Sequence, residues 1–339
     1  MENSKPNSTP FLQKNISILL VVGIALAAFV AGRLSSQIAP NILGNKQDNS
    51  LQKAKDAGKE IMEFASSKND KPEVKFFVMS FCPYGNEAET SLKPVYELFK
   101  DKIDLKPQYI VDKIQFDQVC QTQVYNEKTC QGYVDQGYFP DLASCKERFY
   151  PTVSACMESL NEQALKVKDN DNEGYVSLHG LNETRQDIRE ICAWNMVDDK
   201  QQWWNFVDNI NKNCTLENVE TCWEEQASSV GIGVSEINDC LANEASQLLD
   251  EEIAQSSQYQ VSGSPTFIIN GQQYPAQEAY AENTVMQIGN KAYEIEEYRL
   301  SNTLKSAICE SFEKQPKECS TQLTSDPAST QVAEDGSCG

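Results

Sequence analysis

The stretch that decides the fold runs from Val74 to Gly85 and reads VKFFVMSFCPYG. Its first six residues are rich in β-branched and aromatic side chains, which predicts a short strand. From Ala88 to Phe99 the apolar residues recur at helical spacing, so a helix follows the strand. Cys82 therefore lies at a strand-to-helix junction. A further short strand within residues 105–111 would complete a βαβ unit.

This junction favours a reactive thiol. Free N–H groups and the positive end of the helix dipole meet at a helix N-terminus, and both stabilise a thiolate. Pro83 occupies the first turn, where its missing N–H leaves no helical hydrogen bond unmade. We therefore predict that Cys82 is the catalytic residue and has a lowered pKa, and that Pro83, Tyr84 and Gly85 face the substrate.

Residues 261–274 read VSGSPTFIINGQQY, a second informative stretch. The order predicts a proline turn, a strand, an Asn-Gly hairpin turn and a return strand. We expect an extended substrate segment to pair with the backbone at Ser264, Pro265 and Thr266, by strand addition at an open edge.

Taken together, the two stretches resemble the thioredoxin fold of the DsbA type. The shared features are a strand, Cys-Pro-Tyr at a helix start, and later Gly-Ser-Pro-Thr before a strand and hairpin. The resemblance implies an α/β thioredoxin-like fold with a cis Ser264–Pro265 bond in a loop that faces Cys82. A large helical insertion, stapled by disulfides, would separate the two halves.

The middle of the chain is similar to a second family, the gamma-interferon-inducible lysosomal thiol reductases. Their signature is Cys-Gln-His-Gly-x-x-Glu-Cys-x-x-Asn-x4-Cys. The residues that match it in register are His179, Gly180, Glu183 and Cys192. The residues that depart from it are Ser177 and Thr184, in place of the first two cysteines, and Asp187, in place of the asparagine.

Gly85 stands where both families have the second cysteine of Cys-x-x-Cys. That second thiol normally resolves the mixed disulfide. Without it, Cys82 acts as a monothiol resolved by an external thiol such as glutathione, or another cysteine of the chain resolves it. The first mechanism predicts an oxidoreductase for protein or low-molecular-weight disulfides. The alternative is a non-catalytic thioredoxin-like binding or scaffold module.

The chain has 12 cysteines and no Cys-x-x-Cys pair, which favours structural disulfides in an oxidising compartment. We expect nested pairs, Cys120–Cys156 and Cys130–Cys145, with Cys120–Cys130 and Cys145–Cys156 as the alternative. Setting Cys82 aside leaves an odd number, so at least one further thiol is unpaired or is a partner for Cys82. Cys338 is a candidate resolving or disulfide-forming thiol. The other structural disulfide candidates are Cys192, Cys214, Cys222, Cys240, Cys309 and Cys319.

Composition excludes several function classes. The net charge of −21 disfavours nucleic acid as a partner, because like charges repel. A single histidine excludes sites built on several histidines, and we expect neither a metal nor another cofactor.

An apolar segment predicts a single membrane anchor at residues 16–34, flanked by a short cytoplasmic N-terminus at 1–15. The alternative is a cleaved signal peptide and a secreted protein. Either way the remainder would lie outside the cytoplasm. We expect a linker at 35–71 with a short helix within 51–64, a thioredoxin-like domain at 72–319 with its insertion at about 112–258, and a flexible tail at 320–339.

Overall fold

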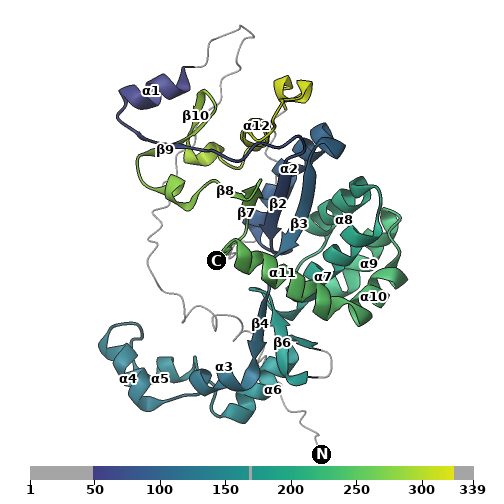
Figure 1. The fold of residues 1–339 in the computed structure, drawn as a ribbon. Coiled ribbons are helices and arrows are strands. Elements are labelled where there is room, and N and C mark those ends of the chain that lie inside the picture. The colour runs from purple at the N-terminus through teal and green to yellow at the C-terminus, as the bar shows by residue number, and fades with distance from the viewer. Residues whose placement is uncertain (1–48, 168–169, 324–339) are drawn as a thin grey trace, which may run out of the picture.

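A computed structural model describes residues 49–167 and 170–323 (Figure 1). Its central sheet has the strand order β3-β2-β7-β8. The bounds are β2 Glu73–Val78, β3 Asp104–Tyr109, β7 Thr266–Ile269 and β8 Gln272–Tyr274. Strands β2 and β3 are parallel, whereas β7 pairs antiparallel with both β2 and β8. Helix α2, Pro83–Phe99, connects β2 to β3. This βαβ unit followed by a hairpin is a thioredoxin-like fold, as the sequence predicts.

Helices cover both faces of the central sheet. Successive side chains of β2 point to opposite faces, so neighbouring residues pack against different helices. On one face Phe76 stacks on Trp204 of α8, Lys200–Asn213, at a ring-centroid distance of 5.8 Å. On the other face Phe77 meets Tyr259, the residue that ends α11, Ala245–Gln258. The aromatic residues Trp203, Trp204 and Phe206 of α8 are therefore part of the core.

The remaining helices of this part lie beside the sheet in Figure 1. They are α7 Leu181–Met196, α9 Val219–Ser229 and α10 Val234–Asn243, with α12 Ser301–Glu310 packed on α2. The sequence predicts one helix over 234–255, but the structure breaks it at Glu244. The break lets α10 pack on α7 while α11 runs along β3 and β4. Disulfides join Cys192 to Cys240, Cys214 to Cys222, and Cys309 to Cys319.

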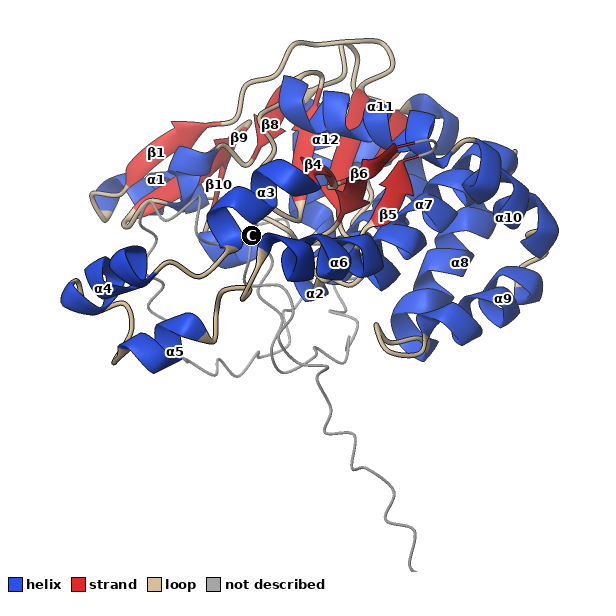
Figure 2. Cartoon of the chain, turned by 90° about the horizontal axis from the view of Figure 1, so that it is seen from below, coloured by secondary structure: helices blue, strands red, loops and turns tan. Residues whose placement is uncertain are grey.

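The insertion is not wholly helical. It contains a three-stranded sheet of order β4-β6-β5, formed by β4 Asp112–Gln115, β6 Asn170–Val176 and β5 Leu165–Val167. Beyond this sheet lies a lobe of four short helices, seen from below in Figure 2. They are α3 Phe116–Gln123, α4 Glu127–Asp135, α5 Leu142–Lys146 and α6 Val153–Gln163. Polar residues over 170–173 hide β6 from the sequence pattern.

Two disulfides staple this lobe. Cys120 bonds to Cys156 and Cys130 to Cys145, with Cα–Cα distances of 5.7 and 5.8 Å. These are the nested pairs that the cysteine spacing predicts, and the sequential pairing is wrong.

Part of the predicted linker at 35–71 is folded. Residues Ser50–Asp56 form α1 and Glu60–Glu63 form β1, whereas the sequence predicts one helix there. Strand β1 pairs with β9, Thr284–Ile288, whose other neighbour is β10, Lys291–Tyr293. Strand β1 depends on hydrogen bonds to the distant strand β9, and the local sequence pattern does not predict this pairing. Short 3₁₀ turns occur at Lys100–Lys102, Gln277–Tyr280, Ile295–Glu297 and Lys317–Ser320.

No helix within residues 49–167 and 170–323 is long and apolar enough to cross a membrane. The predicted anchor at 16–34 lies outside these residues, as do the N-terminal segment 1–15 and most of the predicted tail.

Candidate functional site

Cys82 is the N-cap residue of α2, with Pro83 in the first turn. The Gly85 N–H donates to the Cys82 sulfur at 3.3 Å, so the sulfur receives one of the orphan donors of the helix start. The cysteine is fully buried. This is the placement that the sequence predicts, and it favours a thiolate when Cys82 is reduced.

The loop before β7 closes over the same sulfur. The Ser264–Pro265 bond is cis, which confirms the prediction from the resemblance. The Ser264 carbonyl oxygen lies 3.5 Å from the Cys82 sulfur. Thr266 turns its hydroxyl back onto the Gly263 carbonyl at 2.8 Å. The two sequence stretches that predict the site are therefore brought together.

Gly85 is held tightly between these two segments. A Cβ at this position would come within 2.7 Å of Ser264 Oγ and 3.5 Å of Cys82 Cβ. The same Ser264 hydroxyl accepts the Met79 N–H at 3.3 Å. The space that a side chain at position 85 needs is thus occupied by the proline loop.

Tyr84 is the exposed residue of the Cys-Pro-Tyr-Gly stretch, with 47% of its surface accessible. The Arg299 guanidinium lies over its ring at 5.8 Å from the centroid. Pro83 and Gly85 are buried, so of the predicted substrate-facing residues next to Cys82, Tyr84 is the one that solvent reaches.

None of the cysteines that the structure describes is free. Five disulfides pair ten of them, and Cys82 is disulfide-bonded as well. All ten structural candidates named from the sequence are in these five disulfides. Cys338 lies outside the described residues.

Two carboxylates of α7 reach the segment that carries Cys82. Asp187 Oδ1 accepts the Ser80 N–H at 3.0 Å and the Ser80 hydroxyl at 2.6 Å. Glu183 Oε1 accepts the Phe81 N–H at 3.0 Å. Sequence reasoning placed neither residue at the site. Their i, i+4 spacing inside the matched reductase signature was the available signal.

The signature residues themselves lie together at the start of α7. The Glu183 carboxylate accepts the backbone N–H of His179 at 2.8 Å and is hydrogen-bonded to the His179 Nδ1, also at 2.8 Å. Thr184 Oγ1 accepts the Ser177 N–H at 2.9 Å. The positions of the first two cysteines of the signature are therefore in contact here.

Further carboxyl groups are buried near this helix. Burial, together with the charge of Glu183, raises the pKa of Asp187 well above its usual range. Burial and the charge of Glu190 do the same for the pKa of Glu89. Burial also raises the pKa of Glu190 to about 7, although its carboxylate accepts the Tyr109 hydroxyl at 2.6 Å. Carboxyl groups whose pKa values are raised by burial thus lie beside the segment that carries Cys82.

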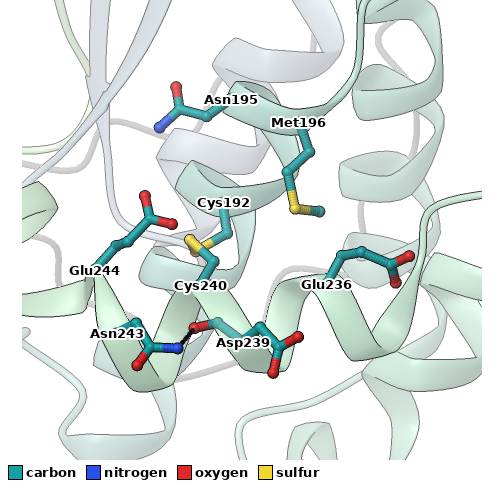
Figure 3. A pocket seen from close by; sticks show the side chains of 8 residues that line it. All are labelled: Cys192, Asn195, Met196, Glu236, Asp239, Cys240, Asn243 and Glu244. Carbon is teal, nitrogen blue, oxygen red and sulfur yellow. Dashed lines mark hydrogen bonds between the residues drawn. A yellow bond between two sulfur atoms is a disulfide. The ribbon is translucent and has the colours of Figure 1, made fainter.

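A separate pocket of about 400 Å³ lies at the other end of α7, between its last turn and α10 (Figure 3). Its lining includes the Cys192–Cys240 disulfide and the acidic residues Glu236, Asp239 and Glu244. It contains none of the residues predicted to be catalytic or to face the substrate. No group of residues in the described part of the chain is arranged to hold a metal ion.

Comparison with known proteins agrees with the fold. A family model described as the vacuolar sorting receptor thioredoxin-like domain matches residues 138–287. No curated protein sequence matches the chain.

Solved structures similar to this chain include two oxidoreductases and a disulfide reductase. A DsbG disulfide bond oxidoreductase from Mycobacterium tuberculosis has 12% identity and a TM-score of 0.36, covering 75% of this chain and 88% of that one. The disulfide reductase DsbM from Pseudomonas aeruginosa has 9% identity and a TM-score of 0.36, covering 69% of this chain and 95% of that one. The oxidoreductase NmDsbA1 from N. meningitidis has 15% identity and a TM-score of 0.31, covering 61% of this chain and 75% of that one. Similarities of this size say nothing about the activity of this chain.

Proposed function

We propose that this protein is a thiol–disulfide oxidoreductase whose attacking sulfur is Cys82. One observation carries the proposal: the Cys82 sulfur sits at the start of α2, between the Gly85 N–H at 3.3 Å and the Ser264 carbonyl at 3.5 Å. The first contact stabilises a thiolate. The second marks the backbone edge along which an extended disulfide-containing segment would pair.

The resolving thiol is Cys338 in this proposal. The five disulfides use ten of the 12 cysteines in the sequence, and the other two are Cys82, which is itself disulfide-bonded, and Cys338. Gly85 is packed against Ser264, so resolution from position 85 is blocked. This favours a resolving cysteine within the chain over the monothiol mechanism with an external thiol.

The tail is long enough for this role. Asn302 of α12 holds both backbone groups of Leu323, and Ser301 bonds to the Ser91 carbonyl in the middle of α2. The distance along α2 from Ser91 to Cys82 is roughly half the length of this helix, on the order of 12 Å. The 15 residues from 323 to 338 span up to about 50 Å when extended.

The exchange balances in electrons. The Cys82 thiolate attacks a substrate disulfide, forming a mixed disulfide and releasing one substrate thiolate. The Cys338 thiolate then attacks the Cys82 sulfur, forming the Cys82–Cys338 disulfide and releasing the second substrate thiolate. Two electrons pass from the protein dithiol to the substrate, and the reverse sequence oxidises a substrate dithiol.

The substrates in this proposal are protein disulfides or glutathione-like small thiols. An oxidising compartment outside the cytoplasm fits the five disulfides of the described residues. We propose that the segment at 16–34 anchors the domain there, and carbonate extraction with protease shaving of intact cells tests this. A soluble domain with a new N-terminus near residue 35 would instead support signal cleavage.

The test compares the full chain with Cys82→Ser and Cys338→Ser in an insulin-reduction assay, together with non-reduced peptide mapping. We expect a Cys82–Cys338 peptide, no turnover in Cys82→Ser, and accumulated mixed disulfides in Cys338→Ser. Turnover that survives in Cys338→Ser would restore the monothiol mechanism. If the wild type neither turns over nor traps partners, the non-catalytic binding module is the better account.

A further inference from the structure

The segment Met79–Cys82 joins the end of β2 to the start of α2, and each of its four backbone N–H groups has a partner. Met79 donates to Ser264 Oγ at 3.3 Å, and Cys82 donates to the Met79 carbonyl at 3.0 Å. The two N–H groups between them, of Ser80 and Phe81, donate to Asp187 and Glu183 at 3.0 Å each. Two of these four N–H groups thus donate to side chains of α7, a helix outside the central sheet.

We infer that Glu183 and Asp187 are positioning residues for Cys82, fixing the two peptide units that precede its sulfur. This inference deepens the proposed function and rests on it. The pair lies one helical turn apart on α7, so both side chains face the Cys82 segment together. Neither touches the reacting sulfur in the structure.

Both side chains are themselves fixed by further bonds. Glu183 also accepts the His179 N–H and Nδ1, and Asp187 also accepts the Ser177 hydroxyl. Both carboxylates are fully buried. A buried carboxylate with three partners leaves its acceptor atoms little freedom, which makes it a rigid clamp rather than an adjustable contact.

The clamp decides where the Cys82 sulfur points. Rotation of the Ser80 or Phe81 peptide would move the cysteine out of the N-cap position and away from the Gly85 N–H. The thiolate would then lose the donor that stabilises it, and the thiol pKa would rise.

The experiment shortens the Glu183 side chain while keeping its carboxyl group. Glu183→Asp withdraws that carboxyl group from the Phe81 N–H. Glu252→Asp is the matched control, because Glu252 is also buried and accepts a backbone N–H, that of Tyr109 at 2.7 Å, in β3. Glu183→Gln keeps the length of the side chain and an acceptor oxygen without the charge.

The measurement is the alkylation rate of reduced Cys82 in the full chain as a function of pH. We expect Glu183→Asp to raise the midpoint by about one unit and slow alkylation at pH 7 about fivefold. Glu252→Asp should leave both unchanged, and Glu183→Gln should alkylate no more slowly than the wild type. Equal rates in Glu183→Asp and Glu252→Asp, or a Glu183→Gln variant as slow as Glu183→Asp, would overturn the inference.

Two additions keep the result interpretable. If Glu183→Asp does not fold, Ser80→Ala removes the hydroxyl donor to Asp187, and we expect a smaller slowing in the same direction; no slowing overturns the inference. Alkylation needs no turnover, so an inactive wild type with a normal Glu183 effect would reject the proposed function and keep the clamp.

Discussion

The lobe of α3–α6 and the Cys82 segment are both short pieces of chain, yet they are held by different bonds. The lobe has a small core built around Phe116 and Leu160, and two disulfides cross-link it. The Cys82 segment sits against the main core and is held by hydrogen bonds to buried carboxylates. Where little apolar surface is buried, cross-links provide the stability; where burial is large, the fold tolerates buried acids. The lobe should therefore respond to reductant, and the region around α7 to pH.

The largest expected effect breaks the lobe. Cys120→Ala with Cys156→Ala opens a loop with a sequence separation of 36 and should destabilise the lobe by about 4 kcal/mol, because the unfolded chain regains its freedom. Amide hydrogen exchange should show protection lost over 116–163 and kept in the central sheet.

The matched control is Cys214→Ala with Cys222→Ala, a loop with a separation of only 8, for which about 2.5 kcal/mol is expected. Loss of protection in β2 and β7 on opening the Cys120–Cys156 loop would contradict the separation of the two regions.

A second prediction concerns the buried acids of the main core. Burial raises the pKa of Glu252 to about 7 from its ordinary 4.5, so protonation favours the folded state. This contribution to stability is fully present below about pH 4.5, is lost as the pH rises through about 7, and amounts to about 3 kcal/mol. Urea unfolding of the main core at pH 5 and pH 8 measures it.

Glu252→Gln should flatten this pH dependence, because an amide does not titrate. Protection within the lobe should change little between the two pH values. A wild type whose unfolding midpoint is the same at pH 5 and pH 8, or a variant with the wild-type slope, would refute the assignment.

The smallest effect is expected at position 85. From the sequence, Gly85→Cys should restore a resolving thiol and raise turnover. The structure predicts instead that the new Cβ displaces the Ser264 hydroxyl, at 2.7 Å, and destabilises the protein by about 1–2 kcal/mol. Adding Ser264→Ala should relieve the clash and allow turnover, measured as Tm and insulin reduction. Additive changes in Tm would show that the two positions do not interact.

Local patterns predicted the elements that carry the site. Short-range periodicity and turn chemistry predicted a strand over 74–79, found at Glu73–Val78, and the Asn-Gly hairpin. Cys82 at the N-cap of α2 follows from the same signals. The nested disulfides followed from paired spacing, which nearby helices preserve.

What sequence reasoning missed depends on contacts between distant segments. The sequence marks Glu183 and Asp187 only as positions of the reductase signature. Their partners at Ser80 and Phe81 are about a hundred residues earlier. Strand β1 exists because β9 lies beside it, and β6 is too polar to show strand alternation. Neither periodicity nor composition encodes such pairings.

Helix α7 also works as a strut. Its first turns are hydrogen-bonded to the Cys82 segment, and its last turn is joined to α10 by the Cys192–Cys240 disulfide. Reduction of the Cys192–Cys240 disulfide would remove the covalent link between α7 and α10. Movement of α7 would then reach the segment that carries Cys82. A strong reductant added to drive turnover would thus assay a loosened molecule. Mild reductants, which leave the buried Cys192–Cys240 disulfide intact, are the ones that would report on the intact protein.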